Sequence, residues 1–191
     1  MTRRTVFSRT VVMLVIAAGV GAPAGAEDAA LDPRAQNAAA LLDSTDAYQR
    51  QVGFLRLEAL RDPATGPIIR RHMASKDAEH RAQAVRALGA VEGVRAVPDL
   101  IDALRNDRDP DVRRSALLGL ETLAPQDPQV LPALIGALRD SKAEVRMSAV
   151  DVVSRIDDPR AREAIRERDR RERNRNVRRV LSAAMDRLGD G

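Results

Sequence analysis

The sequence predicts an all-α protein, an α-solenoid of about five helix pairs, and three observations support this fold class. The 191-residue chain contains 32 Ala and 30 Arg but only two Phe, one Tyr and no Trp, which favours closely packed helices over a β core. An apolar helical pattern recurs with a period near 32 residues. A helix pair of that length cannot bury its apolar stripe alone, so the pairs must stack around one continuous core.

The first 26 residues have the order of charge and hydropathy that is typical of a cleavable export signal. Arg3, Arg4 and Arg9 precede a short apolar run, and Ala24-Gly25-Ala26 provides a small-residue cleavage site. The run is about ten residues long, whereas a spanning helix needs roughly 20. We therefore expect a signal peptide at 1–26, cleaved after Ala26, rather than a retained anchor. The absence of cysteine excludes a lipoprotein anchor, disulfides and thiolate metal sites.

Export also changes how the charge of the chain is interpreted. Residues 2–7, Thr-Arg-Arg-Thr-Val-Phe, resemble a twin-arginine signal, so either the Sec or the twin-arginine route is expected to deliver the protein to a bacterial periplasm or the exterior. Without the signal, 29 basic and 28 acidic residues remain, a net charge of +1. That balance, together with the shortage of aromatic side chains for base stacking, disfavours nucleic acid as a partner.

One helix of each repeat is marked by an arginine that recurs at spacings of 31, 32, 33 and 32 residues. Small or apolar residues follow the arginine at offsets of 3, 7 and 10, which is one face of an amphipathic helix. Four residues before most of these arginines stands Asp or Asn, which we expect to cap the helix. The arginines are Arg50, Arg81, Arg113, Arg146 and Arg178, and the Asp and Asn caps are Asp46, Asp77, Asp109 and Asn174.

Another predicted helix precedes each of these helices, so the arginine-bearing helix is the second of its pair. Pro98 and Pro132 stand ahead of Leu-Ile pairs and suit the first helical turn, where the missing N–H has no intrahelical partner. Turn signals such as Asp62-Pro63 and Asp157-Asp158-Pro159 separate the units. We expect one domain, residues 27–191, with units at approximately 32–61, 62–92, 93–124, 125–157 and 158–189.

The middle units resemble HEAT repeats. The segments that carry the resemblance are 77–89 and 109–120 in the second helices, together with Pro98 and Pro132 in the first helices. The match is closest to the short, phycobilisome-lyase-like variety, and it implies an armadillo-type superhelix over nearly all of residues 32–189. The end units depart from the pattern, with Gly53 replacing the usual alanine. Atypical ends are expected where a terminal unit faces water.

No motif in the sequence indicates catalysis or a bound cofactor, so we expect a non-enzymatic protein. Phosphate-binding loops, paired metal-ligand motifs and nucleophile elbows are absent. His72 and His80 straddle one turn, but a metal site would need a third ligand such as Asp77 or Glu79. We interpret the two histidines as partly exposed polar residues.

Two sets of residues on the second helices receive a role from their register. Arginines at a fixed offset in stacked helices can reach carboxylates and carbonyls of neighbouring turns, and Arg81, Arg113 and Arg146 are assigned to structural stacking on this basis. The other face lines the concave side in HEAT-like proteins and is the candidate surface for a protein or peptide partner; the alternative is an ordinary solvated face. Its candidate residues are Arg86, Arg114, Leu118, Met147, Asp151 and Arg155.

An Arg-rich helix is predicted at 160–179, with ten arginines against four acidic residues. It is interpreted as a solvated end cap held by pairs such as Glu167–Arg171, as a docking site for an acidic partner, or as a contact with an anionic membrane surface, although it lacks the apolar face of an interfacial helix. The candidate basic patch is Arg166, Arg170, Arg171, Arg173, Arg175 and Arg179.

Together these observations predict an exported scaffold or adaptor that binds a protein or peptide partner through its concave face. The phycobilisome-lyase resemblance implies an alternative, a helper or subunit in the attachment of a prosthetic group to another protein. No catalytic residues of that family map onto this sequence.

Overall fold

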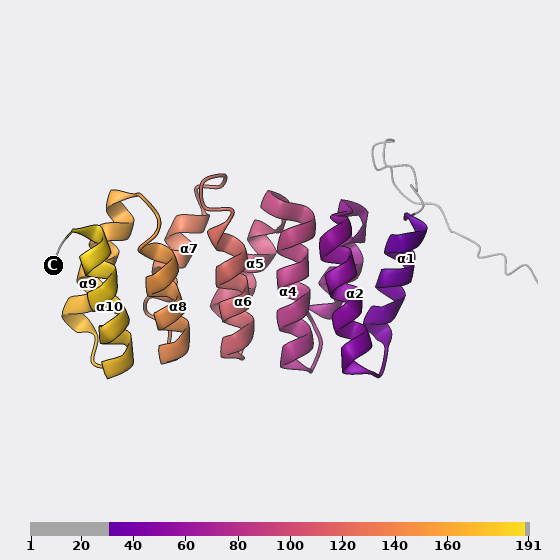
Figure 1. Cartoon of the computed structure of the whole chain (residues 1–191), viewed down its shortest axis with the longest axis horizontal. Helices are drawn as coiled ribbons and strands as arrows, with labels where there is room; N and C mark the ends of the chain where they lie inside the picture. The colour runs from indigo at the N-terminus through magenta and orange to yellow at the C-terminus, as the bar shows by residue number, and fades with distance from the viewer. Residues whose placement is uncertain (1–30, 190–191) are drawn as a thin grey trace, which may run out of the picture. The chain divides into compact units, whose positions relative to one another are not determined.

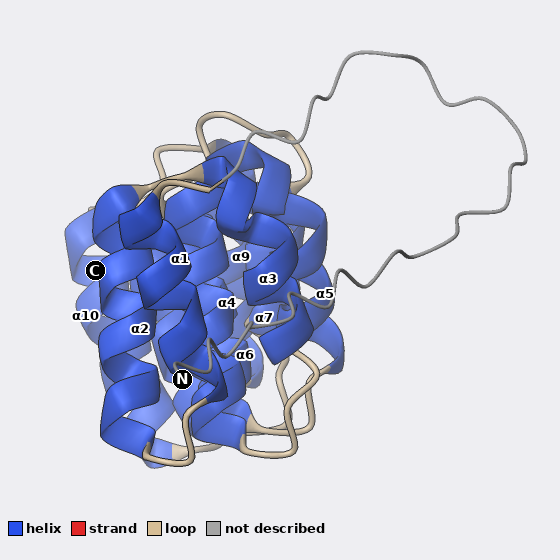
Figure 2. Cartoon of the chain, turned by 90° about the vertical axis from the view of Figure 1, so that its right-hand side faces the viewer, coloured by secondary structure: helices blue, strands red, loops and turns tan. Residues whose placement is uncertain are grey.

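The computed structural model describes residues 31–189, which form a stack of five helix pairs. The predicted signal peptide lies outside these residues. Figure 1 shows α2, α4, α6, α8 and α10 as a row with α5 and α7 behind it, and Figure 2 looks along the row. The pairs are α1 (Pro33–Ala40) and α2 (Ala47–Leu60), α3 (Gly66–His72) and α4 (Ala78–Glu92), α5 (Val97–Asn106) and α6 (Pro110–Glu121), α7 (Val130–Ala137) and α8 (Ala143–Val153), and α9 (Pro159–Arg171) and α10 (Arg175–Leu188).

The second helix of each pair begins directly after the residue that stands four before the repeated arginine. Asp46 accepts a hydrogen bond from the Tyr48 backbone N–H, and Asp77 accepts from the backbone N–H groups of Glu79 and His80. Asp109 and Asn174 cap α6 and α10 in the same way. These bonds satisfy N–H groups that have no partner within the helix. The predicted N-caps are therefore confirmed, while Lys142 stands at the same position of α8 without a side-chain cap bond.

The predicted apolar stripe of the second helices forms the core of the stack. At the offset of seven residues from the arginine, Leu57, Leu88, Leu120 and Val153 are fully buried. The first helices contribute residues such as Leu100 and Leu134 to the same core cluster, which runs from α1 to α10. The all-helical, solenoid fold class is confirmed, because the described residues form helices and no strands.

Gly53 has a structural reason in the first pair. A Cβ atom at this position would lie 2.8 Å from the backbone oxygen of Ala38 and 2.9 Å from a methyl group of Leu42. The first helix therefore approaches α2 more closely than an alanine would allow.

The prediction of one Arg-rich helix over 160–179 is wrong. The chain leaves the α conformation at Glu172, which is extended at φ −72° and ψ 133°, and a new helix begins after Asn174. Glu172 accepts hydrogen bonds from the backbone N–H groups of Arg173 and Asn174, so its side chain organises the turn. The basic stretch is therefore divided between α9 and α10. Within residues 31–189, no helix is both long and apolar enough to cross a membrane.

Candidate partner-binding surfaces

The repeated arginines form a ladder that joins successive helix pairs. Arg113 lies on α6 and donates two hydrogen bonds to the carboxylate of Asp140, which follows α7. One comes from Nε at 2.7 Å and the other from Nη2 at 2.8 Å. The remaining nitrogen of Arg113 donates to the backbone oxygen of Asp107 at 2.9 Å. Arg81 binds Asp107, and Arg146 binds Glu172, through the same pair of hydrogen bonds from Nε and Nη2. This planar fork matches a carboxylate and fixes both its position and its orientation.

The carboxylates of the ladder also recur at a fixed place in the sequence, a signal that the predictions above do not include. Asp107, Asp140 and Glu172 each stand six residues before the arginine of their own unit. The side chain at this position accepts a hydrogen bond from the backbone N–H two residues later, as in Asp107 with Asp109 and Asp140 with Lys142. One carboxylate thus organises the turn within its own unit and also accepts hydrogen bonds from the arginine of the preceding unit.

Burial and hydrogen bonding act in opposite directions on these carboxylates. Burial alone would raise the pKa of Glu172, but hydrogen bonds from Arg146, from the Asn174 backbone and from Arg168 outweigh it and lower the pKa to about 2. The pKa values of Asp107 and Asp140 are lowered in the same way, against burial, mainly by Arg81 and Arg113. The carboxylates are therefore charged at neutral pH, and each faces a charged guanidinium.

The first joint of the ladder is different because Ser75 replaces the carboxylate. Arg50 turns instead to His80, donating from Nε to Nδ1 at 3.0 Å, and to Asp77 at 3.2 Å. Since Nδ1 of His80 accepts this bond, a neutral His80 carries its proton on Nε2, which lies 2.9 Å from Nδ1 of His72. The ring of Phe54 packs edge-on against both imidazoles.

This environment makes the two histidines harder to protonate. Burial is the largest cause of the lowered pKa of both, and for His80 the neighbouring His72 and Arg50 lower the pKa further. The interpretation as partly exposed polar residues is wrong for His80, which is only 6% exposed, because the ring replaces the missing carboxylate as the partner of Arg50. No group of three or more His, Cys, Asp and Glu side chains in residues 31–189 could hold a metal ion.

The arginines predicted to face a partner bind acidic neighbours on the second-helix face. Arg86 on α4 pairs with Glu58 on α2 at 3.0 Å. Arg155, in the turn that follows α8, pairs with Glu121 on α6 at 2.7 Å and with Asp151 on α8 at 2.6 Å. These pairs link neighbouring units across the exposed side of the second helices, parallel to the buried ladder.

The remaining candidates on this face differ in exposure. Leu118 on α6 is 51% exposed, and Leu55, at the same register on α2, is 48% exposed. Met147 is partly buried and packs against the core. Arg114 pairs with Asp111 on its own helix at 2.9 Å and donates to the Ser148 hydroxyl of α8. The two leucines are therefore exposed apolar side chains at one register of this face, and Tyr48, seven residues before Leu55 on α2, is 67% exposed.

The candidate basic patch is divided by the turn at Glu172. On α9, Arg170 pairs with Glu163 at 3.1 Å and Arg171 pairs with Glu167 at 3.0 Å, while Arg166 lies 3.8 Å from Glu163. The others lie after the turn and line an open groove of about 520 Å³ together with Arg178. They are Arg173, Arg175 and Arg179.

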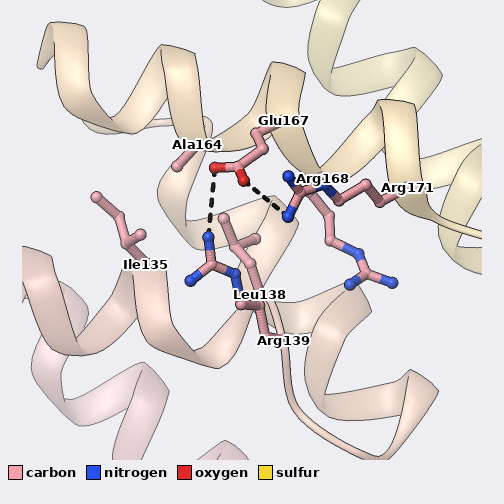
Figure 3. A pocket seen from close by; sticks show the side chains of 7 residues that line it. All are labelled: Ile135, Leu138, Arg139, Ala164, Glu167, Arg168 and Arg171. Carbon is pink, nitrogen blue, oxygen red and sulfur yellow. Dashed lines mark hydrogen bonds and ion pairs between the residues drawn. The ribbon is translucent and has the colours of Figure 1, made fainter.

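The hollows of the described stack do not have the form of an enclosed ligand site. Figure 3 shows a cavity between α7 and α9 in which Glu167 joins Arg139 at 3.3 Å and Arg171 at 3.0 Å. Its volume is about 20 Å³, which is room for about one water molecule. Larger hollows of about 400 to 520 Å³ are open grooves with several charged side chains each, unlike the apolar clefts that enclose small molecules.

Stacked helix pairs, joined by a buried arginine–carboxylate ladder and presenting one face of second helices, define an α-solenoid repeat protein. The chain belongs to the HEAT-repeat family, since the family model for HEAT repeats matches residues 35–121 and 97–186. No curated protein matches the chain.

Solved structures show the same architecture. The chain is similar to a chain of the complex of CpcE and CpcF of phycocyanin lyase from Nostoc sp. PCC7120, with 20% identity and a TM-score of 0.66 over 79% of this chain and 97% of that chain. It is also similar to YibA of Escherichia coli, with 18% identity and a TM-score of 0.60 over 82% of this chain and 60% of that chain. An engineered protein matches with 17% identity and a TM-score of 0.50 over 82% of this chain and 80% of that chain. At such identities the likeness shows the fold alone.

Proposed function

We propose that the protein is a scaffold or adaptor that binds a protein or peptide partner through the face of its second helices. The observation that carries this proposal is the row formed by Leu55, Arg86 and Leu118. These residues hold the same register on α2, α4 and α6, five positions after the ladder arginine, and the two leucines are about half exposed. Arginine is among the residue types enriched at binding hot spots, and the leucines on either side add exposed apolar area that a bound segment can cover.

The spacing of the row defines the shape of the partner. Neighbouring packed helices lie about 8–10 Å apart, so Leu55 and Leu118 are separated by about 16–20 Å. An extended segment covers that distance in about five or six residues at roughly 3.3 Å per residue. We therefore propose a partner segment with two apolar side chains at this separation and an acceptor between them for Arg86.

The charge of the face supports recognition without strong attraction to every anion. Arg86 already has Glu58 as a partner, and Arg155 has Glu121 and Asp151. A partner must therefore share or displace these carboxylates, which costs affinity unless its own groups are well placed. The expected preference is for a mixed apolar and polar segment rather than a simple acidic one.

The proposal is tested by selecting peptides from a displayed random library on the full chain and measuring their affinity by fluorescence anisotropy. Leu55→Asp and Leu118→Asp are expected to weaken binding about tenfold or more, as at an interface anchor. Val94→Asp is the matched control, because Val94 is also an exposed apolar residue but lies between α4 and α5. Peptides that bind the two leucine variants as tightly as the original chain would contradict the assignment of the surface.

A second candidate is a helper role in attaching a prosthetic group to another protein. It is supported by the likeness to a chain of the phycocyanin lyase complex, which spans 97% of that chain. That structure contains two different proteins, CpcE and CpcF, which also supports the proposal of a protein partner for this chain. Titration of the full chain with a linear tetrapyrrole tests this candidate: a saturable shift in the absorption spectrum supports it, and an unchanged spectrum eliminates it.

We also propose that the protein is exported through residues 1–26. Fractionation of a bacterial host that expresses the full chain is expected to place the mature protein in the periplasm or the medium, with Glu27 as its first residue. Replacing Arg3 and Arg4 by Lys should block a twin-arginine route but leave a Sec route intact. Recovery of the chain in the cytoplasm with residues 1–26 still attached would overturn the proposal.

A further inference from the structure

The arginine ladder continues to the last helix of the stack, where its final member has a different environment. Arg178 lies on α10 at the register of Arg113 and Arg146, four residues after the N-cap Asn174 and three before the buried Leu181. In the described chain α10 packs against α8 and α9. Arg178 is exposed.

The three preceding joints show what an arginine at this register binds. Arg81, Arg113 and Arg146 each direct Nε and a terminal nitrogen to both oxygens of an Asp or Glu in the next unit, at 2.7 to 3.2 Å. Arg178 holds the same position on its helix, so the same side-chain conformation would present its fork to a carboxylate that lies against α10. Three joints of the ladder are closed by a carboxylate, whereas Arg178 pairs with no carboxylate of residues 31–189.

Arg178 lies among other arginines. Arg173, Arg175, Arg178 and Arg179 line the same groove of about 520 Å³, in which the acidic residues are Asp169 and Asp186. In residues 31–189 none of these four arginines forms an ion pair with a carboxylate, whereas the α9 arginines at 160, 162, 168, 170 and 171 all do. The excess positive charge of the basic stretch is thus concentrated in this groove.

We propose that this groove binds the carboxylates of an acidic segment of a partner protein, with Arg178 gripping one carboxylate as the ladder arginines do and Arg173, Arg175 and Arg179 binding its acidic neighbours. A carboxylate is the expected ligand because arginines at the same register bind Asp or Glu at three other places in the described stack. Arginine is suited to this task because its planar fork forms two parallel hydrogen bonds with a carboxylate.

This site is separate from the row of Leu55, Arg86 and Leu118, because it lies on α9 and α10 rather than on α2, α4 and α6. A partner that carries both an acidic segment and an apolar segment would be held at two places, which raises its affinity through effective concentration. Each site can nevertheless fail its own test without affecting the other.

The test measures the binding of a fluorescein-labelled hexaglutamate peptide to the full chain by anisotropy, with a hexaglutamine peptide as the uncharged control. Arg178→Ala is expected to weaken binding about fivefold or more, and Arg178→Lys about threefold, because lysine keeps the charge but not the fork. Arg162→Ala removes the same charge from a side chain already paired with Asp157 and should change the affinity less than about twofold. Since Arg178 is exposed, its variants should unfold at the same urea concentration as the original chain.

Three results would overturn the proposal. Equal losses in Arg178→Ala and Arg162→Ala would show a diffuse charge effect rather than a site. Binding to phosphatidylglycerol vesicles that depends on Arg178, without binding to hexaglutamate, would assign the groove to a lipid surface. Self-association of the full chain that is abolished by Arg178→Ala, again without hexaglutamate binding, would assign it to a second copy of the chain.

Discussion

Removing one ladder arginine should cost the stack far more stability than removing an arginine from its exposed face. In Arg113→Ala, two charged hydrogen bonds to Asp140 and one to the Asp107 backbone are lost. The side chains of Arg113 and Asp140 are only 8% and 11% exposed, so water replaces the lost bonds poorly. Breaking such a pair by removing one partner costs about 3–5 kcal/mol. We expect about 3 kcal/mol, because Asp140 keeps the hydrogen bond from the Lys142 backbone.

The assay is urea unfolding of the full chain followed by far-ultraviolet circular dichroism. Arg155→Ala is the matched control, since Arg155 also bridges two units through carboxylates but is 45% exposed. It should cost only about 0.2–1 kcal/mol, as is typical of exposed ion pairs. Combining Arg113→Ala with Asp140→Ala should cost less than the two single changes together, with a coupling energy of about 0.5–3 kcal/mol.

A loss of less than about 1 kcal/mol for Arg113→Ala, equal to that of the Arg155 control, would refute the reasoning. It would mean that the apolar core alone holds the units together and that the two-pronged geometry adds nothing. An additive double variant would contradict the ladder as well, because residues in direct contact are expected to be coupled.

Three further predictions concern the core, the first joint and the close approach of the first helices. Leu120→Ala should lose about 2–5 kcal/mol in the same urea assay, because Leu120 is fully buried on α6; a loss under about half a kcal/mol would mean that the repeat register is wrong. His72 and His80 have lowered pKa values in the fold, so the unfolded chain binds more protons than the folded chain at pH values between the folded and the unfolded pKa values. The stability that the two neutral imidazoles contribute is complete above a pH of about 6.5 and is lost as the pH falls through the lower folded pKa values. The urea midpoint should therefore fall on acidification more in the original chain than in a His72→Gln/His80→Gln variant, and parallel pH profiles would contradict this. Gly53→Ala should destabilise the chain by about 1–3 kcal/mol through overpacking against α1, whereas Gly136→Ala, where a Cβ meets nothing within 4 Å, should stabilise α7 by about 0.5–1 kcal/mol; equal effects in a thermal melt would refute the explanation for Gly53.

Much of the fold could be predicted because the same pattern of arginine, apolar and capping residues recurs in the sequence several times. The spacing of the arginines, the apolar offsets and the capping Asp residues give the second helices independently, and each occurrence supports the others. The composition of the Arg-rich stretch favours helix throughout, which led to the wrong prediction of one helix over 160–179, whereas the N-cap predicted at Asn174 marks the start of the second helix. The turn depends on Glu172, whose side chain binds the backbone of Arg173 and Asn174 and the guanidinium of Arg146.

The candidate surfaces were harder to predict, because they depend on contacts between units. The ladder carboxylates carried a readable signal, since Asp107, Asp140 and Glu172 keep the spacings of the arginines. Pairs such as Arg86 with Glu58 and Arg155 with Glu121 had no such signal, because they depend on how far one helix is rotated against the next. The exposed arginines that the repeat register indicated as partner contacts thus form ion pairs with their neighbours.

The most direct test of a partner-binding second-helix face is a hydrogen-exchange footprint of the full chain with a selected peptide. The account predicts slower exchange of backbone amides in α2, α4 and α6, centred on Leu55, Arg86 and Leu118, because a segment that covers the row suppresses local opening of those helices. Protection confined to α3, α5 and α7 would place the partner on the opposite layer of the stack and would contradict the account.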